Sequence, residues 1–246
     1  MKDNFSTRSD LYSKFRPTYP DELFSFLLAH LPNQENAWDC GTGNGQVAQQ
    51  LAVHFNHVYG TDISQSQLDN TVQLPNITYA KQPAEHTNFT SHTFDLIVVA
   101  QAIHWFKFNE FYAEVKRTIK PNGLLAVMGY GVLGITSQID VVVNKLYTDI
   151  IGPYWDKERR YIDENYQTIP FPFEEIECPT FAITQHWTVD HLIGYLETWS
   201  AVKHYQNHNG INPLELIKKD LIEAWGDVKE RRISFPVLLR LGKISS

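Results

Sequence analysis

The sequence predicts an α/β fold built on a doubly wound, mostly parallel sheet. In the first half of the 246 residues, apolar runs rich in β-branched residues alternate with helical patterns. The run FDLIVVA (94–100) is apolar throughout, as expected of a strand covered by helices on both faces. A glycine-rich turn, GTGNG (41–45), separates the first strand pattern from the helical pattern that follows it. Together these features predict parallel strands with a ligand site at their carboxyl edge.

Each element of the first half follows from a local pattern. Short apolar runs predict strands over 36–40, 58–61, 77–81, 94–100 and 124–129. Helical spacing of apolar residues predicts helices over 46–54, 65–73 and 108–119. Pro121-Asn122-Gly123 is typical of a turn, so we expect it to close the helix that precedes it.

The second half is less regular. A helical pattern over 138–151 is followed by the polar and aromatic stretch YWDKERRYIDENY and by PFPF. Residues 181–187 predict a strand, and Thr188 can cap a helix that reaches about Tyr205. Asn212-Pro213 can open another helix, which reaches Trp225. Residues 233–241 predict a last strand, and we expect Pro236 to place it at an edge or a bulge.

Composition limits the classes of partner. The formal net charge of −7 argues against broad attraction to nucleic acid or to an anionic membrane. The short basic pairs Arg159-Arg160 and Arg231-Arg232 read as solvated surface. The two cysteines, Cys40 and Cys178, predict neither a disulfide framework nor a zinc cluster, and we expect no metal.

The sequence shows no pattern typical of a secretion signal or a membrane span. The stretch MKDNFSTRSDLY lacks the apolar core of a secretion signal, and no apolar run approaches the roughly 18 residues that a membrane span needs. We therefore expect a cytoplasmic protein with a small-molecule substrate, acting as a monomer or a homodimer.

The glycine turn does not match the known phosphate-binding patterns. A dinucleotide fingerprint needs a glycine at its sixth position, and counting from Gly41 that position is Gln46. No Gly-Lys-Ser/Thr follows, so a P-loop is also disfavoured. Asp39 would lie close to a bound pyrophosphate, and two like charges in a partly buried cleft repel by roughly several kcal/mol.

A positively charged cofactor fits this turn better than a phosphate does. S-adenosylmethionine carries an ammonium group and a sulfonium, and Asp39 can lie on the ammonium side while the glycines let the backbone approach closely. Asp62 ends the second strand pattern, where an acid can accept from both ribose hydroxyls. Each residue also has a structural explanation: the glycines can serve only a tight turn, and Asp62 can serve only as a helix cap.

Five sequence blocks in order resemble the motifs of class I S-adenosylmethionine-dependent methyltransferases. They are AWDCGTGNGQVA, VYGTDIS, PAEH, FDLIVVAQAIHWF and VKRTIKPNGLLAV. FRPTYP, the HWF triplet and YLETWSAV resemble in particular the trans-aconitate methyltransferase-like subgroup. The resemblance implies a Rossmann-like methyltransferase fold with a seven-stranded sheet and a helical insertion as a substrate cap.

The resemblance also assigns cofactor contacts residue by residue. Asp39, Gly41, Gly43 and Gly45 match the cofactor loop, and Asp62 matches the ribose acid, with Ile63 packing on the adenine. Ala84 and Glu85 match the segment beside the adenine ring. Gln101 and Ala102 follow the fourth strand, where the family's backbone meets the methionine moiety.

This organisation implies one domain of residues 1–246, because no repeat or linker divides the chain. Residues 1–35 form an N-terminal arm and 36–130 form the cofactor-binding half. Residues 131–180 are the insertion that covers the substrate, and 181–246 complete the sheet.

The N-terminal arm supplies candidate residues that close over the cofactor. Tyr12, Arg16 and Tyr19 lie in SDLYSKFRPTYP, whose prolines prevent a continuous helix. Tyr12 and Arg16 can close over the cofactor, with Arg16 toward a carboxylate, and Tyr19 is a candidate substrate contact. The alternative is an arm that packs on the sheet, with Arg16 paired to a surface acid.

His104 and Trp105 follow the fourth strand, at the edge where chemistry is expected. Trp105 can shield the reacting methyl group from water or fill the core. Methyl transfer is an in-line displacement that depends mainly on positioning. A carboxylate acceptor needs no base, because it is already ionised near neutral pH. A hydroxyl or carbon acid must lose a proton, and His104 is then the candidate general base.

The substrate side is predicted to be lined by Tyr130, Trp155 and Trp199, with His204 as a further candidate. Trp199 also lies on an apolar helical stripe, which favours a core role. The main hypothesis is a small-molecule methyltransferase that can form methyl esters of a carboxylic acid, and the acceptor atom stays open between O, N and C. The alternatives are a nicotinamide oxidoreductase and a non-catalytic cofactor-binding protein, and RNA methylation is disfavoured by the acidic balance.

Overall fold

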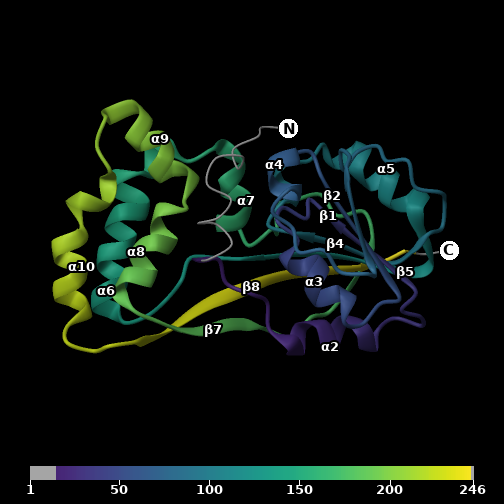
Figure 1. Ribbon diagram of the computed structural model, residues 1–246, viewed down its shortest axis with the longest axis horizontal. Coiled ribbons are helices and arrows are strands. Elements are labelled where there is room, and N and C mark those ends of the chain that lie inside the picture. Colours follow the sequence, from purple (N-terminus) through teal and green to yellow (C-terminus); the bar gives the residue numbers. More distant parts are fainter. Residues whose placement is uncertain (1–14, 245–246) are drawn as a thin grey trace.

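The computed structural model describes residues 15–244, and its centre is a mostly parallel sheet (Figure 1). Seven strands follow the order β3-β2-β1-β4-β5-β8-β6, and β7 pairs with β8 off this path. Strands β1 to β5 pair in parallel, and β8 runs antiparallel to β5, β6 and β7. The strands are β1 (Asn36–Cys40), β2 (His57–Asp62), β3 (Ile77–Lys81), β4 (Phe94–Ala100), β5 (Ile119–Tyr130), β6 (Glu174–Ile176), β7 (Ala182–Trp187) and β8 (Arg231–Lys243). This arrangement confirms the predicted fold class.

Helices cover both faces of the sheet, as the apolar β4 requires. Leu96 and Val98 of β4 pack in one core with α2 (Asp21–Ala29) and α3 (Gln46–Ala52). Ile97 and Val99 point to the other face and pack in a second core with α5 (Phe108–Thr118). Successive side chains of a strand alternate between faces, so a strand buried on both sides reads as continuously apolar.

A helical group lies beside one end of the sheet in Figure 1 and is joined to it by the long β8. Its helices are α6 (Ser137–Asn144), α8 (Val189–Glu197), α9 (Ser200–Asn209) and α10 (Lys218–Trp225), and α7 (Arg160–Asp163) lies between this group and the sheet (Figure 1). Short turns of other helical types link them: η2 (Lys145–Ile150), η3 (Gly152–Tyr154), η4 (Lys157–Arg159) and η5 (Pro213–Leu216). The group therefore draws on the expected insertion 131–180 and on the segment after it. Over the described residues, no helix is both long and apolar enough to cross a membrane.

The helix predicted over 65–73 is shorter in the structure. α4 covers only Gln65–Leu68. Asn70 Nδ2 donates to Ser66 O, and Thr71 Oγ1 donates to Leu68 O. These polar side chains occupy carbonyls that a longer helix would need, so they end the helix early.

The helix predicted from Thr188 to about Tyr205 is divided in two. α8 ends at Glu197 and α9 begins at Ser200, with Trp199 in an extended conformation between them. Thr198 Oγ1 donates to Tyr195 O, which takes up a carbonyl at the end of α8.

The two proline-containing segments both lie within strands, and the expectation for the first was wrong. Pro121-Asn122-Gly123 does not form a loop after α5, because β5 already begins at Ile119 and these residues form an irregularity within it. Pro236 lies at a change of partner within β8: residues 231–236 pair with β7, and 237–243 pair with β5.

Candidate active site

The glycine loop between β1 and α3 has a backbone that other residues adopt with difficulty. Gly41, Gly43 and Gly45 have φ values of 74°, 55° and 82°. A Cβ on Gly41 would lie 2.7 Å from the Cβ of Ala102, so this glycine is also needed for close packing against the end of β4. The amides of Gly41 and Thr42 donate to Thr61 O at 2.8 and 2.9 Å. The loop is therefore held against the carboxyl end of β2.

Asp62, the last residue of β2, fixes the same loop from the other side. Its Oδ2 accepts from the amide of Gly43 at 2.9 Å, and its Oδ1 accepts from the amide of Ser64 at 2.8 Å. Carboxylate oxygens have further lone pairs after these bonds. The side chain lines a cavity and can accept from a ligand there.

Asp39 lies deeper than Asp62. It is 1% exposed, and Thr42 Oγ1 donates to its Oδ2 at 2.5 Å. Burial raises the pKa of Asp39 to about 7, with a smaller contribution from the charge of Asp62, while the Thr42 hydrogen bond acts to lower it. A cation bound beside Asp39 would stabilise its ionised form.

These residues line one cavity at the carboxyl edge of β1, β2 and β4. Most of the predicted cofactor residues are among its walls: Arg16, Asp39, Gly41, Gly43, Asp62, Ile63, Gln101, Ala102 and Trp105. Tyr19 and Tyr130, predicted on the substrate side, line this cavity too. Its charged walls are two carboxylates and one guanidinium, which suits a ligand that carries both a cation and a carboxylate better than it suits a pyrophosphate.

Gln101 occupies a strained position at the end of β4. Its φ is 54°, which is uncommon for a residue with a side chain. Gln101 Nε2 donates to Tyr130 O at 3.0 Å, and Arg16 Nη1 donates to Tyr130 Oη at 3.0 Å. These two contacts join the N-terminal arm and β5 to the edge of the cavity.

Several predicted cofactor residues do not line the cavity. Gly45 lies behind the loop at the start of α3, where a Cβ would clash with the ring of Tyr79. Ala84 is buried in the second core, and Glu85 Oε1 accepts from the amide of Lys107 at 3.0 Å. Their roles at the adenine stay predictions, and Tyr12 lies outside the described residues.

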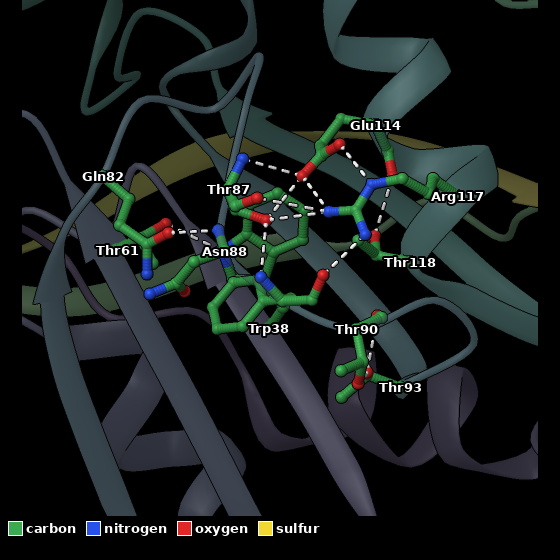
Figure 2. A network of polar contacts seen from close by, with 11 residues as sticks. Trp38, Thr61, Gln82, Thr87, Asn88, Thr90, Thr93, Glu114, Arg117 and Thr118 are labelled. Atoms are coloured by element: carbon green, nitrogen blue, oxygen red, sulfur yellow. Dashed lines mark hydrogen bonds and ion pairs between the residues drawn. The ribbon is translucent and has the colours of Figure 1, made fainter.

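A polar network holds the β3–β4 loop that carries Ala84 and Glu85. Figure 2 shows Glu114 of α5 between Thr87 and Arg117. The Thr87 amide donates to Glu114 Oε1 at 2.8 Å, and Arg117 Nε donates to Glu114 Oε2 at 2.8 Å. Burial acts to raise the pKa of Glu114, but the bonds from Arg117 and Thr87 outweigh it and hold the pKa below its ordinary value.

A second cavity adjoins the first. The two share Arg16, Gln101 and Trp105 as walls. The second cavity is also lined by His104, Trp155, Asp156, Arg159, Ile162, Trp199 and Ser200. It thus contains the predicted substrate residues Trp155 and Trp199, although Trp199 is also 4% exposed and part of the main core. His204 is not among its walls, and its Nδ1 is bonded to Tyr154 O at 3.0 Å.

His104 is neutral in this environment. It is 6% exposed, and among residues 15–244 its Nδ1 has no hydrogen-bond partner. Burial, and then the positive charge of Arg159, lower the pKa of His104 to about 3. A group with this pKa is a weak proton acceptor at neutral pH, so its role as a general base stays a prediction that this environment does not favour.

Arg159 was not predicted as a site residue. The basic pair was expected to be solvated, but only Arg160 is exposed, and the side chain of Arg159 is 19% exposed and lines the second cavity. Its guanidinium lies 4.8 Å from the ring centroid of Trp155. The sequence signal that could have identified Arg159 was its short distance along the chain from Trp155, because an arginine often stacks on an aromatic ring.

A parallel sheet with an acid at the end of each of its first two strands and a glycine loop between them defines an α/β enzyme that binds an adenosine-containing cofactor. The model of the methyltransferase domain family matches residues 38–127, which includes this loop and both acids.

Known proteins extend the match beyond this segment. A protein of Dictyostelium discoideum provisionally named as a methyltransferase is 37% identical over 98% of this chain and 95% of its own length. A solved structure from Anaeromyxobacter dehalogenans, provisionally described as a type II methyltransferase, is 37% identical with a TM-score of 0.88 and covers 94% of this chain and 99% of its own. The chain therefore belongs to the class I S-adenosylmethionine-dependent methyltransferases. S-adenosylmethionine, rather than a nicotinamide dinucleotide, is its cofactor.

Proposed function

We propose that this methyltransferase forms methyl esters of a small carboxylic acid, as its resemblance to the trans-aconitate methyltransferase-like subgroup implies. The observation that carries the proposal is the pair of guanidinium groups, Arg16 and Arg159, in the walls of the second cavity. Arginine presents its donors in a planar fork that matches a carboxylate. Cytoplasmic localisation also stays a prediction.

The cavities are arranged so that an acceptor in the second can face a cofactor in the first. Gln101, Trp105 and Arg16 line both, so they stand where the two ligands meet. Bound S-adenosylmethionine supplies an electrophilic methyl group at this boundary. Trp105 and the indoles of Trp155 and Trp199 restrict water there, and the chain's main contribution is to fix the distance and direction of attack.

The chemistry of a carboxylate acceptor suits a site without an effective base. A carboxylate oxygen forms the new bond to the methyl carbon, the carbon–sulfur bond breaks, and its electron pair stays on sulfur. No proton is released, since the nucleophile is already ionised near neutral pH. His104, with a pKa of about 3, is not required to accept one.

The alternative proposal is a hydroxyl or carbon-acid acceptor, for which His104 would take the proton. This alternative is supported by the position of His104 in the wall of the second cavity. The other alternative is a non-catalytic cofactor-binding protein. One methyl-transfer assay distinguishes ester formation, His104-dependent transfer and the absence of catalysis.

The test uses methyl-labelled S-adenosylmethionine with the purified protein and a panel of mono-, di- and tricarboxylic acids. Methyl esters are cleaved by mild alkali, so our proposal predicts labelled methanol after alkaline treatment of the product. Label in an alkali-stable product would favour the His104-dependent alternative. Cofactor binding without transfer to any acid, or to any metabolite in an extract, would favour the non-catalytic one.

A further inference from the structure

Arg159 is held in place by a hydrogen bond, an ion pair and two aromatic rings. It lies at the end of η4, and its Nε donates to Tyr147 Oη at 2.9 Å and lies 3.6 Å from Asp163 Oδ1. The guanidinium lies over two rings, with its carbon 4.8 Å from the Trp155 centroid and 5.4 Å from the Tyr147 centroid. Tyr147 Oη in turn donates to Asp163 Oδ1. This set of contacts fixes the plane of the guanidinium.

The two terminal nitrogens of Arg159 are not used by these contacts. Within the described part of the chain, neither has a hydrogen-bond partner. Arg240 shows the contrast, because its three nitrogens bind Glu175 and the carbonyls of Tyr166 and Ile169. A buried structural arginine has its donors satisfied, whereas Arg159 keeps a rigid pair of donors beside a cavity.

The surroundings of this pair favour an anion. Arg16 and Arg159 are the cationic walls of the second cavity, and Asp156 is its acidic wall. Asp156 Oδ2 lies 3.9 Å from His204 Nδ1, so the imidazole of His204 lies beside this carboxylate. His104, which shares the cavity, is buried and neutral and has an unpartnered Nδ1 among residues 15–244.

We infer that Arg159 is the residue that determines specificity for the acceptor, by binding a carboxylate of the substrate through its two terminal nitrogens. Arg159 lines only the second cavity, whereas Arg16 also faces the cofactor side. The group that Arg159 binds therefore lies on the acceptor, away from the cofactor. This inference rests on the proposed function, because it names the residue that recognises the proposed acid.

The test compares Arg159→Gln and Arg159→Lys with the wild type, and Arg160→Gln is the matched control. Arg160 is the exposed neighbour, and it is not in the walls of either cavity. With the acid that the wild type esterifies best, we expect Arg159→Gln to raise KM roughly tenfold or more, because a charge-assisted bond is lost. We expect a smaller change in kcat, an unchanged Kd for S-adenosylmethionine, and partial recovery in Arg159→Lys, which restores charge without the fork. An unchanged KM in Arg159→Gln would overturn the inference and leave the proposed function standing.

A binding measurement separates this inference from the proposed function. If the wild type esterifies no acid, the proposed function fails, and calorimetry with citrate on the protein loaded with S-adenosylhomocysteine still tests Arg159. Citrate binding to the wild type and to Arg160→Gln, with at least a tenfold loss in Arg159→Gln, would support an anion site at Arg159. Equal binding to all three proteins, or binding to none, would overturn it.

Discussion

Asp62 and Gly43 are 19 residues apart in sequence, and the Gly43 amide donates to the Asp62 carboxylate at 2.9 Å. The acid at the end of β2 therefore shapes the glycine loop before any ligand binds. The loop geometry and the predicted ribose contact therefore depend on the same side chain.

Asp62→Ala should weaken S-adenosylmethionine binding by about 1–3 kcal/mol, because it removes an acceptor and leaves the Gly43 and Ser64 amides without their partner. Isothermal titration calorimetry measures the change in affinity. Asp69→Ala is the control, since Asp69 is exposed and is bonded to Gln65. Equal affinities in wild type and Asp62→Ala would show that the ribose does not lie at this acid.

Gly41→Ala should lower the free energy of unfolding by more than backbone strain alone would. Gly41 and Gly210 have nearly equal φ values, 74° and 75°, but a Cβ on Gly41 would lie 2.7 Å from Ala102 Cβ and one on Gly210 would meet nothing within 4 Å. Gly210→Ala should therefore lose roughly 1–2 kcal/mol of unfolding free energy, and Gly41→Ala should lose more. Denaturant unfolding compares the two, and only Gly41→Ala should also lose cofactor affinity. Equal losses of stability would mean that the loop shifts without cost.

Asp39→Asn should stabilise the cofactor-free protein at high pH. The pKa of Asp39 is raised from its model-compound value of 3.8 to about 7, so the folded state binds a proton that the unfolded state releases as pH rises from about 4 to 7. The contribution of Asp39 to the free energy of unfolding is therefore lost as pH rises through this range. Thermal unfolding should give Asp39→Asn a larger advantage at pH 8 than at pH 5. An advantage independent of pH would contradict the assignment.

The same substitution should weaken cofactor binding. A bound cation favours the ionised form of Asp39, so wild-type affinity for S-adenosylmethionine should rise as pH increases from 5 to 8. Asp39→Asn cannot ionise, so its affinity should be lower at pH 8 and should follow pH less. Calorimetry at several pH values checks this, and identical pH profiles would place the ammonium elsewhere.

Glu114→Gln should loosen the β3–β4 loop shown in Figure 2. The substitution removes the charge that accepts from Arg117 and Thr87 in a side chain only 5% exposed, and such charged hydrogen bonds contribute about 1.5–3 kcal/mol. Because the pKa of Glu114 is lowered, its contribution is present above its unfolded pKa and is lost as pH falls through the folded value. The deficit of Glu114→Gln should thus be larger at pH 7 than at pH 3 in denaturant unfolding.

Glu110→Gln provides the comparison on the same helix, because Glu110 is exposed and its ion pair, among residues 15–244, is with the exposed Lys107. Its unfolding free energy should change by less than about 0.5 kcal/mol. A similar small effect for Glu114→Gln would show that the network does not hold the loop.

Strong local signals made the cofactor edge predictable. β1, β3 and β4 have the predicted bounds. The signal was clearest for β4, which is buried along nearly its whole length and therefore has an almost continuous apolar run. The glycines and the two acids also lie where their spacing placed them, since the turn from a strand into the next helix is short and local.

Contacts between distant segments were less predictable. Burial of Arg159 depends on Tyr147 and Trp155, whose rings meet only after η2 and η3 have folded. Pro236 lies where β8 changes from β7 to β5, and a local pattern cannot show which strands will pair. The lowered pKa of His104 likewise follows from burial and from the charge of Arg159, which is 55 positions further along the chain. The position of His104 after β4 therefore suggested a stronger base than the fold provides.

A crystal structure with S-adenosylhomocysteine and the preferred carboxylic acid tests the central claim most directly. We predict ribose hydroxyls on Asp62, the amino group on the side of Asp39, and a carboxylate of the acid against Arg159. A nucleoside bound away from Asp62, or an acceptor with no contact to Arg159 or Arg16, would contradict this account.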